Sequence, residues 1–132
     1  MSRIVHIAVK VAELEKPKAF YENVFGFKHV ETVHHKGHIS CHMSDGITDL
    51  TLIQYESEDA PEAMLAGAGP CIHHFAIEVD DPMKYEAEVR KFGCEVFTAP
   101  GKFPIKFRAP GGTVTEIVPE ARYEKLGKAR SK

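Results

Sequence analysis

Hydrophobic and polar residues alternate in two segments of the chain, one at its start and one near its middle. In residues 3–11, RIVHIAVKV, one face carries the apolar residues Val5, Ile7, Val9 and Val11, and His6 lies on the opposite face. Residues 72–79, IHHFAIEV, repeat the alternation, with His74 opposite the apolar face and His73 on it. Because an apolar strand face needs a covering element, both segments are predicted to be strands that turn His6 and His74 away from the helices.

Each of these segments is followed by apolar residues at helical spacing. Residues 14–25 and 82–92 show the pattern of an amphipathic helix, and each pattern ends at a glycine, Gly26 or Gly93, which suits a left-handed cap. Alternating segments after each helix predict three further strands in each half of the chain. These are residues 27–34, 38–43 and 48–55 in the first half, and 94–98, 105–109 and 113–118 in the second.

The two halves form an internal repeat of the order β-α-β-β-β. Its landmarks are the pairs His6 and His74 (offset 68), Gly26 and Gly93 (offset 67), and Gly46 and Gly112 (offset 66). Neither half has enough strands to bury its own sheet face. We therefore predict an α+β fold in which two βαβββ modules form paired, curved mixed sheets around a concave cleft, with the helices outside.

Length and composition indicate a single domain. The chain has 132 residues, of which 43% are hydrophobic and 27% charged, values typical of one globular domain. Within residues 1–132 we expect a first module at about 3–55, a linker at 56–70, a second module at 71–119 and a tail at 120–132.

Charge, hydropathy and cysteine content indicate which partners and which cellular compartment to expect. Lys and Arg total 17 against 19 for Asp and Glu, so there is no basic surplus for binding nucleic acid. No apolar run approaches the roughly 20 residues of a membrane helix. The three cysteines lack C-x-x-C spacing, which is typical of free thiols in a reducing compartment. We expect a cytoplasmic protein that binds neither nucleic acid nor membranes.

The unusual feature of the composition is eight histidines. His6 and His74 are equivalent in the repeat and face the predicted cleft, where two imidazoles suit a divalent metal ion. In the last strand, TVTEIV, Glu116 lies within an apolar alternation, and an acid is costly to bury there unless it is paired or bound to a cation. We predict one divalent metal ion, Fe(II), Zn, Ni or Mn, on His6, His74 and Glu116. Taken singly, each could instead be an ordinary strand residue.

A predicted hairpin, HHKGHISCH, holds four more histidines, at His34, His35, His38 and His42. These side chains could bind a second metal ion. Histidines that follow one another across a turn are usually exposed to solvent, however, and we expect that outcome here.

Four motifs are distributed along almost the whole chain: V-H-I-A-V, A-F-Y-x-x-V-F-G-F, H-H-F-A-I-E-V-D and F-R-A-P-G-G-T-V-T-E-I-V. Between about Ile4 and Val118 the sequence resembles the vicinal oxygen chelate superfamily, which includes glyoxalases, extradiol dioxygenases, methylmalonyl-CoA epimerases and bleomycin-resistance proteins. The resemblance implies paired βαβββ modules. It places the family's metal ligands at His6, His74 and Glu116, and it implies that the Glu116 carboxylate also takes part in catalysis.

The sequence departs from this family at identifiable positions. Lyases and epimerases usually have a fourth ligand, Glu or Gln, on the fourth strand of the first module, where this chain has Leu50 or Leu52, depending on the alignment. Gln54 shares their predicted face but lies further along. Extradiol dioxygenases use a tyrosine about ten positions before the final glutamate, and this chain has Lys106 there. The missing fourth ligand favours a three-ligand site of the dioxygenase type.

These observations lead to two functional hypotheses. The first is a metal-dependent enzyme, a dioxygenase or a lyase or isomerase, that binds neighbouring oxygens of a small-molecule substrate. The alternative is a non-catalytic binding protein of the bleomycin-resistance type. We expect a homodimer, because pairing about a two-fold axis covers an exposed sheet edge. The residues predicted to line the substrate pocket are Leu50, Leu52, Gln54, Lys106 and Arg108.

Overall fold

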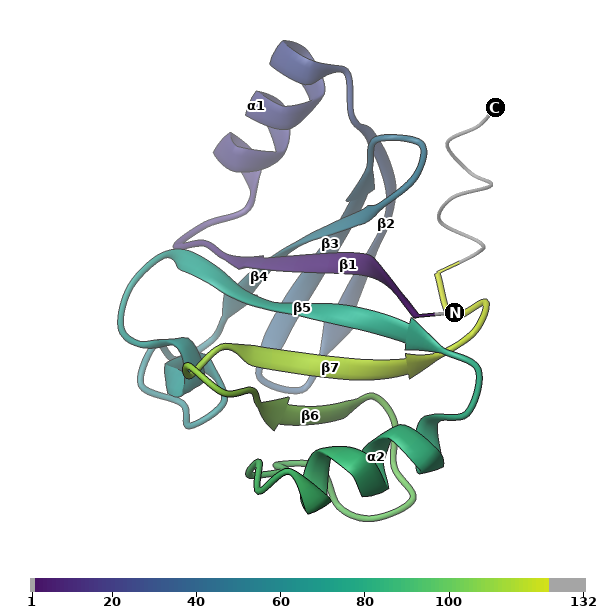
Figure 1. The fold of residues 1–132 in the computed structure, drawn as a ribbon. Coiled ribbons are helices and arrows are strands. Elements are labelled where there is room, and N and C mark those ends of the chain that lie inside the picture. Colours follow the sequence, from purple (N-terminus) through teal and green to yellow (C-terminus); the bar gives the residue numbers. More distant parts are fainter. Residues whose placement is uncertain (1, 124–132) are drawn as a thin grey trace.

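The computed structural model describes residues 2–123, which form a mixed sheet and two α-helices (Figure 1). The α+β class is therefore confirmed. In chain order the elements are β1 (Arg3–Lys10), α1 (Glu15–Phe25), β2 (Lys28–His35), β3 (His38–Ser44), β4 (Asp49–Tyr55), the 3₁₀ helix η1 (Ala63–Ala66), β5 (Cys71–Val79), α2 (Pro82–Lys91), β6 (Ile105–Arg108) and β7 (Val114–Pro119).

The strands form one continuous seven-stranded sheet in the order β2-β3-β4-β1-β5-β7-β6. Two parallel pairs, β1 with β4 and β5 with β7, lie in its interior, and the other neighbours are antiparallel. The expectation of two paired sheets needs correction, because the antiparallel pairing of β1 with β5 joins the two halves into a single sheet.

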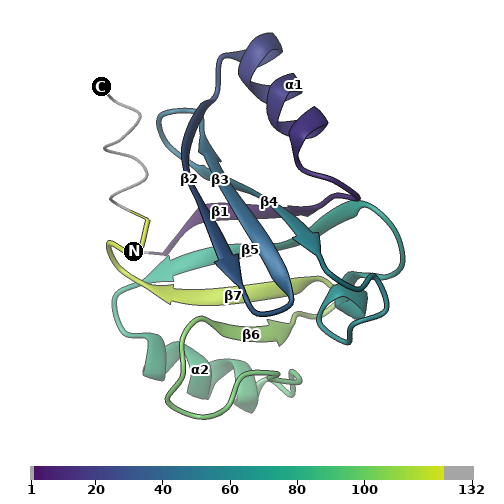
Figure 2. The same ribbon diagram turned by 180° about the vertical axis from the view of Figure 1, so that it is seen from behind.

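The sheet is strongly curved. Figure 1 and Figure 2 show the ribbon of β2 and β3 crossing over one face of β1, β5 and β7. One face of these central strands is therefore covered by another part of the same sheet. The prediction of a concave region is consistent with this arrangement.

The predicted strand 94–98 is replaced by a single isolated bridge between Val96 and Phe107. Residues around it still follow β6, since the Phe97 amide donates to the Lys106 carbonyl at 2.7 Å. Ala99 and then Pro100 follow this segment, and Pro100 has no backbone N–H to donate to a ladder. The remaining predicted strands lie within a residue or two of the observed ones.

Each helix packs on the sheet strands of its own half. On the α1 side the buried residues Cys41, Met43 and Leu52 contact Leu14 and Tyr21. The corresponding cluster on the α2 side consists of Val79, Ile105, Phe107 and Ile117, with Tyr85 and Val89 packed against it.

The predicted linker contains η1, whose buried Ala63 packs against Ala8, Ile53 and Tyr55. Residues 124–132 of the predicted tail lie outside the described residues. Within residues 2–123, neither α-helix is long and apolar enough to cross a membrane.

Candidate metal centre

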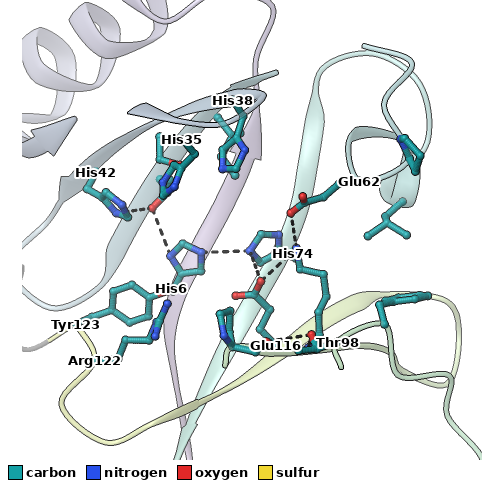
Figure 3. A pocket seen from close by; sticks show the side chains of 18 of the residues that line it. His6, His35, His38, His42, Glu62, His74, Thr98, Glu116, Arg122 and Tyr123 are labelled. Carbon is teal, nitrogen blue, oxygen red and sulfur yellow. Dashed lines mark hydrogen bonds and ion pairs between the residues drawn. The ribbon is translucent and has the colours of Figure 1, made fainter. Parts of the chain in front are cut away.

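Three predicted ligands converge at the middle of the sheet. The ligand atoms of His6 on β1, His74 on β5 and Glu116 on β7 all lie within 4.8 Å of one another, and all three residues are buried. His74 Nε2 is 3.3 Å from His6 Nε2 and 3.3 Å from Glu116 Oε2 (Figure 3). The structure therefore brings together the residues that the sequence predicted to bind a metal ion.

The sheet register explains why these side chains meet. His6 on β1 pairs with Ala76 on β5, and Ala76 pairs with Glu116 on β7, so the three residues form one row across neighbouring strands. His74 lies two residues before Ala76, and alternation therefore turns it to the same face.

The spacing of the three ligand atoms suits a divalent metal ion. With metal–ligand bonds of about 2.0–2.2 Å, ligands in tetrahedral or octahedral positions lie roughly 3.0–3.5 Å apart. Both separations of 3.3 Å from His74 Nε2 fall in this range. Two imidazoles and a carboxylate also form a donor set that several divalent metals accept. The residues fit such an ion, although they do not specify which one.

Asp49, the first residue of β4, contacts His6 on the side of the ring that faces away from the other two predicted ligands. Its side chain is fully buried, and its carboxylate interacts with His6 Nδ1 through Oδ2 and with His42 Nδ1 through Oδ1 at 3.0 Å. The Thr51 hydroxyl donates to Oδ2 at 2.6 Å. The carboxylate therefore contacts His6 on the ring nitrogen opposite to the one that faces the centre, as outer-shell acids do in metal sites.

The sequence reasoning missed Asp49, yet a signal for it was present. The repeat offset of 67, seen at Gly26 and Gly93, relates Asp49 to Glu116. An acid in the first module at the position equivalent to a predicted ligand was therefore a candidate for the site.

His73 does not reach the cavity, in agreement with the predicted alternation. It is almost completely buried and contacts the loop before η1, with its Nε2 at 2.7 Å from the Glu62 carbonyl oxygen. Its Nδ1 lies 2.8 Å from His74 Nδ1. Burial lowers the pKa of His73 to about 4, and burial likewise lowers the pKa of His74. Both rings are therefore neutral at neutral pH.

Lys106 places an ammonium group beside the centre. Its Nζ is 3.4 Å from Glu116 Oε2 and 2.9 Å from Glu62 Oε1. Burial alone would raise the pKa of Glu116, but its hydrogen bond with His74 and the nearby charges outweigh this and lower the pKa to about 2. Glu116 is therefore a carboxylate, as a metal ligand must be.

The centre opens into a cavity of about 810 Å³ between the central strands and the β2–β3 ribbon (Figure 3). The wall opposite His6 and His74 carries His35, His38 and His42. On β4, the residues that line the cavity are Thr51 and Ile53.

The pocket prediction was wrong for β4. Leu50, Leu52 and Gln54 do not line the cavity, and Leu52 is fully buried in the cluster under α1. Because side chains alternate along a strand, the inward face of β4 is that of Asp49, Thr51 and Ile53.

The two basic residues predicted for the pocket differ in position. Lys106 lines the cavity, whereas Arg108 does not. The Arg108 guanidinium instead donates to the carbonyl oxygens of Gly112 at 3.0 Å and Leu65 at 3.2 Å. It holds two loops together and is not available to a ligand in the cavity.

The predicted hairpin histidines are separated by the alternation of β2 and β3. His35 stacks on His38 with ring centroids 4.5 Å apart, while His42 joins Asp49 and His34 does not line the cavity. Within residues 2–123, the only cluster of three potential ligands is that of His6, His74 and Glu116. A second metal site in the hairpin is not supported.

The end of the described chain covers His6. Tyr123 stacks on the His6 ring with centroids 4.8 Å apart and an interplanar angle of 3°. The turn that leads to it is tied to β5, because the Ala121 amide donates to Glu78 Oε2 at 3.2 Å. Nothing in the sequence pattern indicated this contact.

Comparisons with known proteins identify the family of the chain and several proteins with a similar sequence or fold. The family model described as "Glyoxalase/Bleomycin resistance protein/Dioxygenase superfamily" matches residues 3–117. Mitochondrial methylmalonyl-CoA epimerases from Bos taurus and Homo sapiens are each 29% identical over 89% of this chain, which corresponds to 74% and 73% of their own lengths. A solved methylmalonyl-CoA epimerase in complex with methylmalonyl-CoA and NH4+ is 26% identical, with a TM-score of 0.74 over 92% of this chain and 96% of its own. A hypothetical protein from Bacillus halodurans has a TM-score of 0.77 at 20% identity, covering 92% and 96%, which shows the shared fold.

Proposed function

Because the chain belongs to the glyoxalase/bleomycin resistance protein/dioxygenase superfamily, we propose that it is a divalent-metal enzyme acting on a small carbonyl compound. The observation that carries this proposal is the buried cluster of His6, His74 and Glu116, whose ligand atoms open into the cavity. Retention of all three ligands argues against the alternative of a binding protein without catalysis.

Among the reaction classes of the superfamily, we favour an isomerase or epimerase over a dioxygenase. Three of the relatives that match over about nine-tenths of the chain are named methylmalonyl-CoA epimerases. The structure does not supply the missing fourth ligand, because the Thr51 hydroxyl lies 3.4 Å from His6 Nδ1, the ring nitrogen that faces away from the centre. The preference therefore rests on the relatives and not on the number of ligands.

An epimerase removes a proton from a carbon next to a carbonyl group and returns it. A metal ion bound at this site would act as a Lewis acid toward the negative charge that develops on the carbonyl oxygen. The chain itself must supply the group that carries the proton. Glu116, which the sequence analysis identified as catalytic, is one candidate because it borders the cavity.

His42 is the second candidate for proton transfer. It lines the cavity, and its side chain is 16% exposed. Asp49 Oδ1 and the Thr51 hydroxyl contact its Nδ1 at 3.0 Å and 2.8 Å, which leaves Nε2 for the substrate. A histidine oriented by a buried carboxylate is a common arrangement for a general base.

Lys106 is positioned to contact an anionic substrate. Its side chain borders the cavity and is 13% exposed, so Nζ can reach a carboxylate or a phosphate of a bound molecule. The solved relative that binds methylmalonyl-CoA suggests an acyl-CoA thioester as the substrate class.

The experiment has two stages. Metal content is first measured in the wild type and in His6→Ala, His74→Ala and Glu116→Ala, with His29→Ala on the exposed part of β2 as the control. We expect one ion per chain in the wild type and in the control, and strongly reduced binding in the three ligand variants. Absence of metal from the wild type under all loading conditions would refute the proposal.

The second stage tests catalysis on the metal-loaded protein. Methylmalonyl-CoA is incubated in D₂O, and exchange of the proton on the carbon next to the thioester is followed by NMR. Exchange that is lost in Glu116→Ala or His42→Gln supports an epimerase. A protein that binds metal and the thioester without exchange would instead be a binding module.

We also propose that the protein is a homodimer. Helix α1 buries none of its own residues, and Phe20, Val24 and Phe25 on it are between 49% and 62% exposed. A second copy would cover these apolar side chains. Sedimentation equilibrium at micromolar concentration tests this, and a purely monomeric protein would contradict it.

A further inference from the structure

Apolar side chains gather at one end of the cavity. Tyr123 stacks on His6 and marks the opposite end. Ile53 pairs with Lys10, further along β1 than His6, where β4 runs on toward η1. The apolar residues that line this end of the cavity, together called the apolar subsite, are Ile53, Pro61, Leu65, Phe97 and Pro104.

Contacts between neighbouring segments hold the members of the apolar subsite together. The Arg108 guanidinium donates to the Leu65 carbonyl oxygen at 3.2 Å, and its central carbon lies 5.4 Å from the centre of the Phe97 ring. Leu65 and Phe97 therefore contact the same side chain. The Thr98 hydroxyl donates to the Pro104 carbonyl oxygen at 3.0 Å, which ties Pro104 to the residue after Phe97. The subsite thus joins the loop around η1 to the segment before β6.

The loop that carries Pro61 and Leu65 is fixed from the side of the sheet. Lys10 is 5% exposed, and its ammonium group donates to the carbonyl oxygens of Ala63 at 2.7 Å and Gly67 at 2.6 Å. Ala63 is completely buried, so the loop is anchored by packing as well. Because the backbone is held in this way, the Leu65 side chain remains half-buried at the cavity wall. A wall that is already in place costs a ligand little ordering on binding.

The apolar subsite adjoins the metal centre. Lys106 Nζ lies 3.4 Å from Glu116 Oε2 and 2.9 Å from Glu62 Oε1, and Glu62 follows Pro61 in the chain. Figure 3 shows Glu62 on the side of the centre away from Tyr123. A single ammonium group therefore spans the gap between a predicted ligand and the loop around η1. A molecule whose carbonyl oxygen lies at the centre can place a neighbouring group in the subsite.

We propose that the apolar subsite binds a branched or aromatic hydrocarbon group of the substrate, next to the reacting carbonyl. Combined with the proposed function, on which this step rests, the substrate is an acyl thioester with an apolar acyl group. The side chains of Ile, Pro, Leu and Phe offer no hydrogen-bond donor. A second carboxylate, such as that of methylmalonyl-CoA, would lose its hydration in the subsite without compensation, whereas a hydrocarbon group is stabilised by leaving water.

The first experiment uses the metal-free full chain with ¹³C-labelled Leu and Ile methyl groups. Phenylacetate and acetate, which differ only by the apolar group, are titrated separately while the methyl signals are followed by NMR. We expect phenylacetate to shift the signals of Leu65 and Ile53 and to bind about tenfold more tightly than acetate, because its ring leaves water. The signals of Leu52, which is buried under α1, should stay in place.

Leu65→Asp places a charge in the subsite and should weaken phenylacetate binding about tenfold or more. Met64→Asp is the matched control, because Met64 is the preceding residue of η1, is 41% exposed and does not line the cavity. It should bind phenylacetate like the wild type. Leu65→Ala should weaken binding in the same direction, and it decides the matter if Leu65→Asp does not fold. Unchanged affinity in the folded Leu65 variants would overturn the proposal, as would a wild type that binds phenylacetate no more tightly than acetate.

The second experiment connects the subsite to the proposed function. Binding of phenylacetyl-CoA and methylmalonyl-CoA is compared by isothermal titration calorimetry, with and without Zn²⁺. We expect phenylacetyl-CoA to bind about tenfold more tightly. Tighter binding of methylmalonyl-CoA would overturn the proposal and leave the proposed function in place. If neither thioester binds although phenylacetate does, the acyl-CoA class of the proposed function is refuted, whereas the apolar subsite is supported.

Discussion

Replacing Asp49 by Asn tests whether the carboxylate that contacts His6 strengthens metal binding. The substitution preserves the shape of a fully buried side chain but replaces one carboxylate oxygen by an NH₂ group. The carboxylate interacts with the Nδ1 atoms of His6 and His42 and accepts from the Thr51 hydroxyl. An amide has one acceptor oxygen, so its NH₂ group must face a group that previously donated to Asp49.

The expected magnitude follows from the removal of a charged acceptor behind His6. Removal of an outer-shell partner commonly weakens metal binding 10–100-fold, which corresponds to about 1.4–2.7 kcal/mol. The metal-free protein should also lose stability, by about 1.5–3 kcal/mol, because a hydrogen bond to a charged group disappears. Burial would raise the pKa of Asp49, but the hydrogen bonds from His42 and His6 lower it from 3.8 to about 2. This stabilisation is therefore present above pH 4 and is lost as the pH falls toward 2.

The assay is a chelator competition with Zn²⁺ on wild type and Asp49→Asn, together with urea unfolding of the metal-free proteins. Asp59→Asn, on the exposed loop after β4, is the matched control and should change neither quantity. If Asp49→Asn folds and binds Zn²⁺ as tightly as the wild type, Asp49 does not orient His6, and the reasoning about the outer shell is refuted.

Three further predictions concern the core under α1, the charge beside the centre and the buried histidines. Leu52→Ala should cost about 3–5 kcal/mol in urea unfolding without changing Zn²⁺ affinity, because Leu52 is fully buried under α1 and away from the cavity. Lys106→Met should tighten Zn²⁺ binding in the same chelator competition, since it removes an ammonium group 3.4 Å from Glu116 that competes with the metal ion. Burial lowers the pKa of His73 from 6.5 to about 4 and also lowers that of His74. The unfolded chain thus binds more protons below pH 6.5, and urea unfolding of the metal-free protein should show stability falling between pH 6.5 and pH 4.

The convergence of His6, His74 and Glu116 could be predicted from sequence because their strands have unequal faces. In β1 the residues Val5, Ile7 and Val9 share one face, and in β5 Phe75, Ile77 and Val79 do. The direction of His6 and His74 follows from the need to bury these apolar residues. Glu116 was recognisable because its apolar neighbours exclude an unpaired acid. Alternation alone could not reveal that β1 and β5 pair with each other, since this pairing joins residues from the two halves of the chain.

The face of β4 was the error with the largest consequence. Its sequence, DLTLIQY, has apolar residues on both faces, so hydrophobicity does not decide which one faces the cavity. The repeat offset decreases from 68 to 66 along the first module, and an uncertainty of one residue exchanges the two faces of a strand. A fourth ligand was therefore sought at Leu50 and Leu52, when the inward polar groups are Asp49 and Thr51.

The place of the metal centre follows from the join between the two halves. β1 and β5 are the equivalent first strands of the repeat, and their antiparallel pairing turns His6 and His74 toward the same face. Between His6 and Glu116 the register places Ala76, which is completely buried and has no side chain beyond Cβ. A larger residue there would occupy the space above the row, so the small side chain leaves room where the ligand atoms converge. The site therefore needs both halves of the chain, and neither half alone could form it.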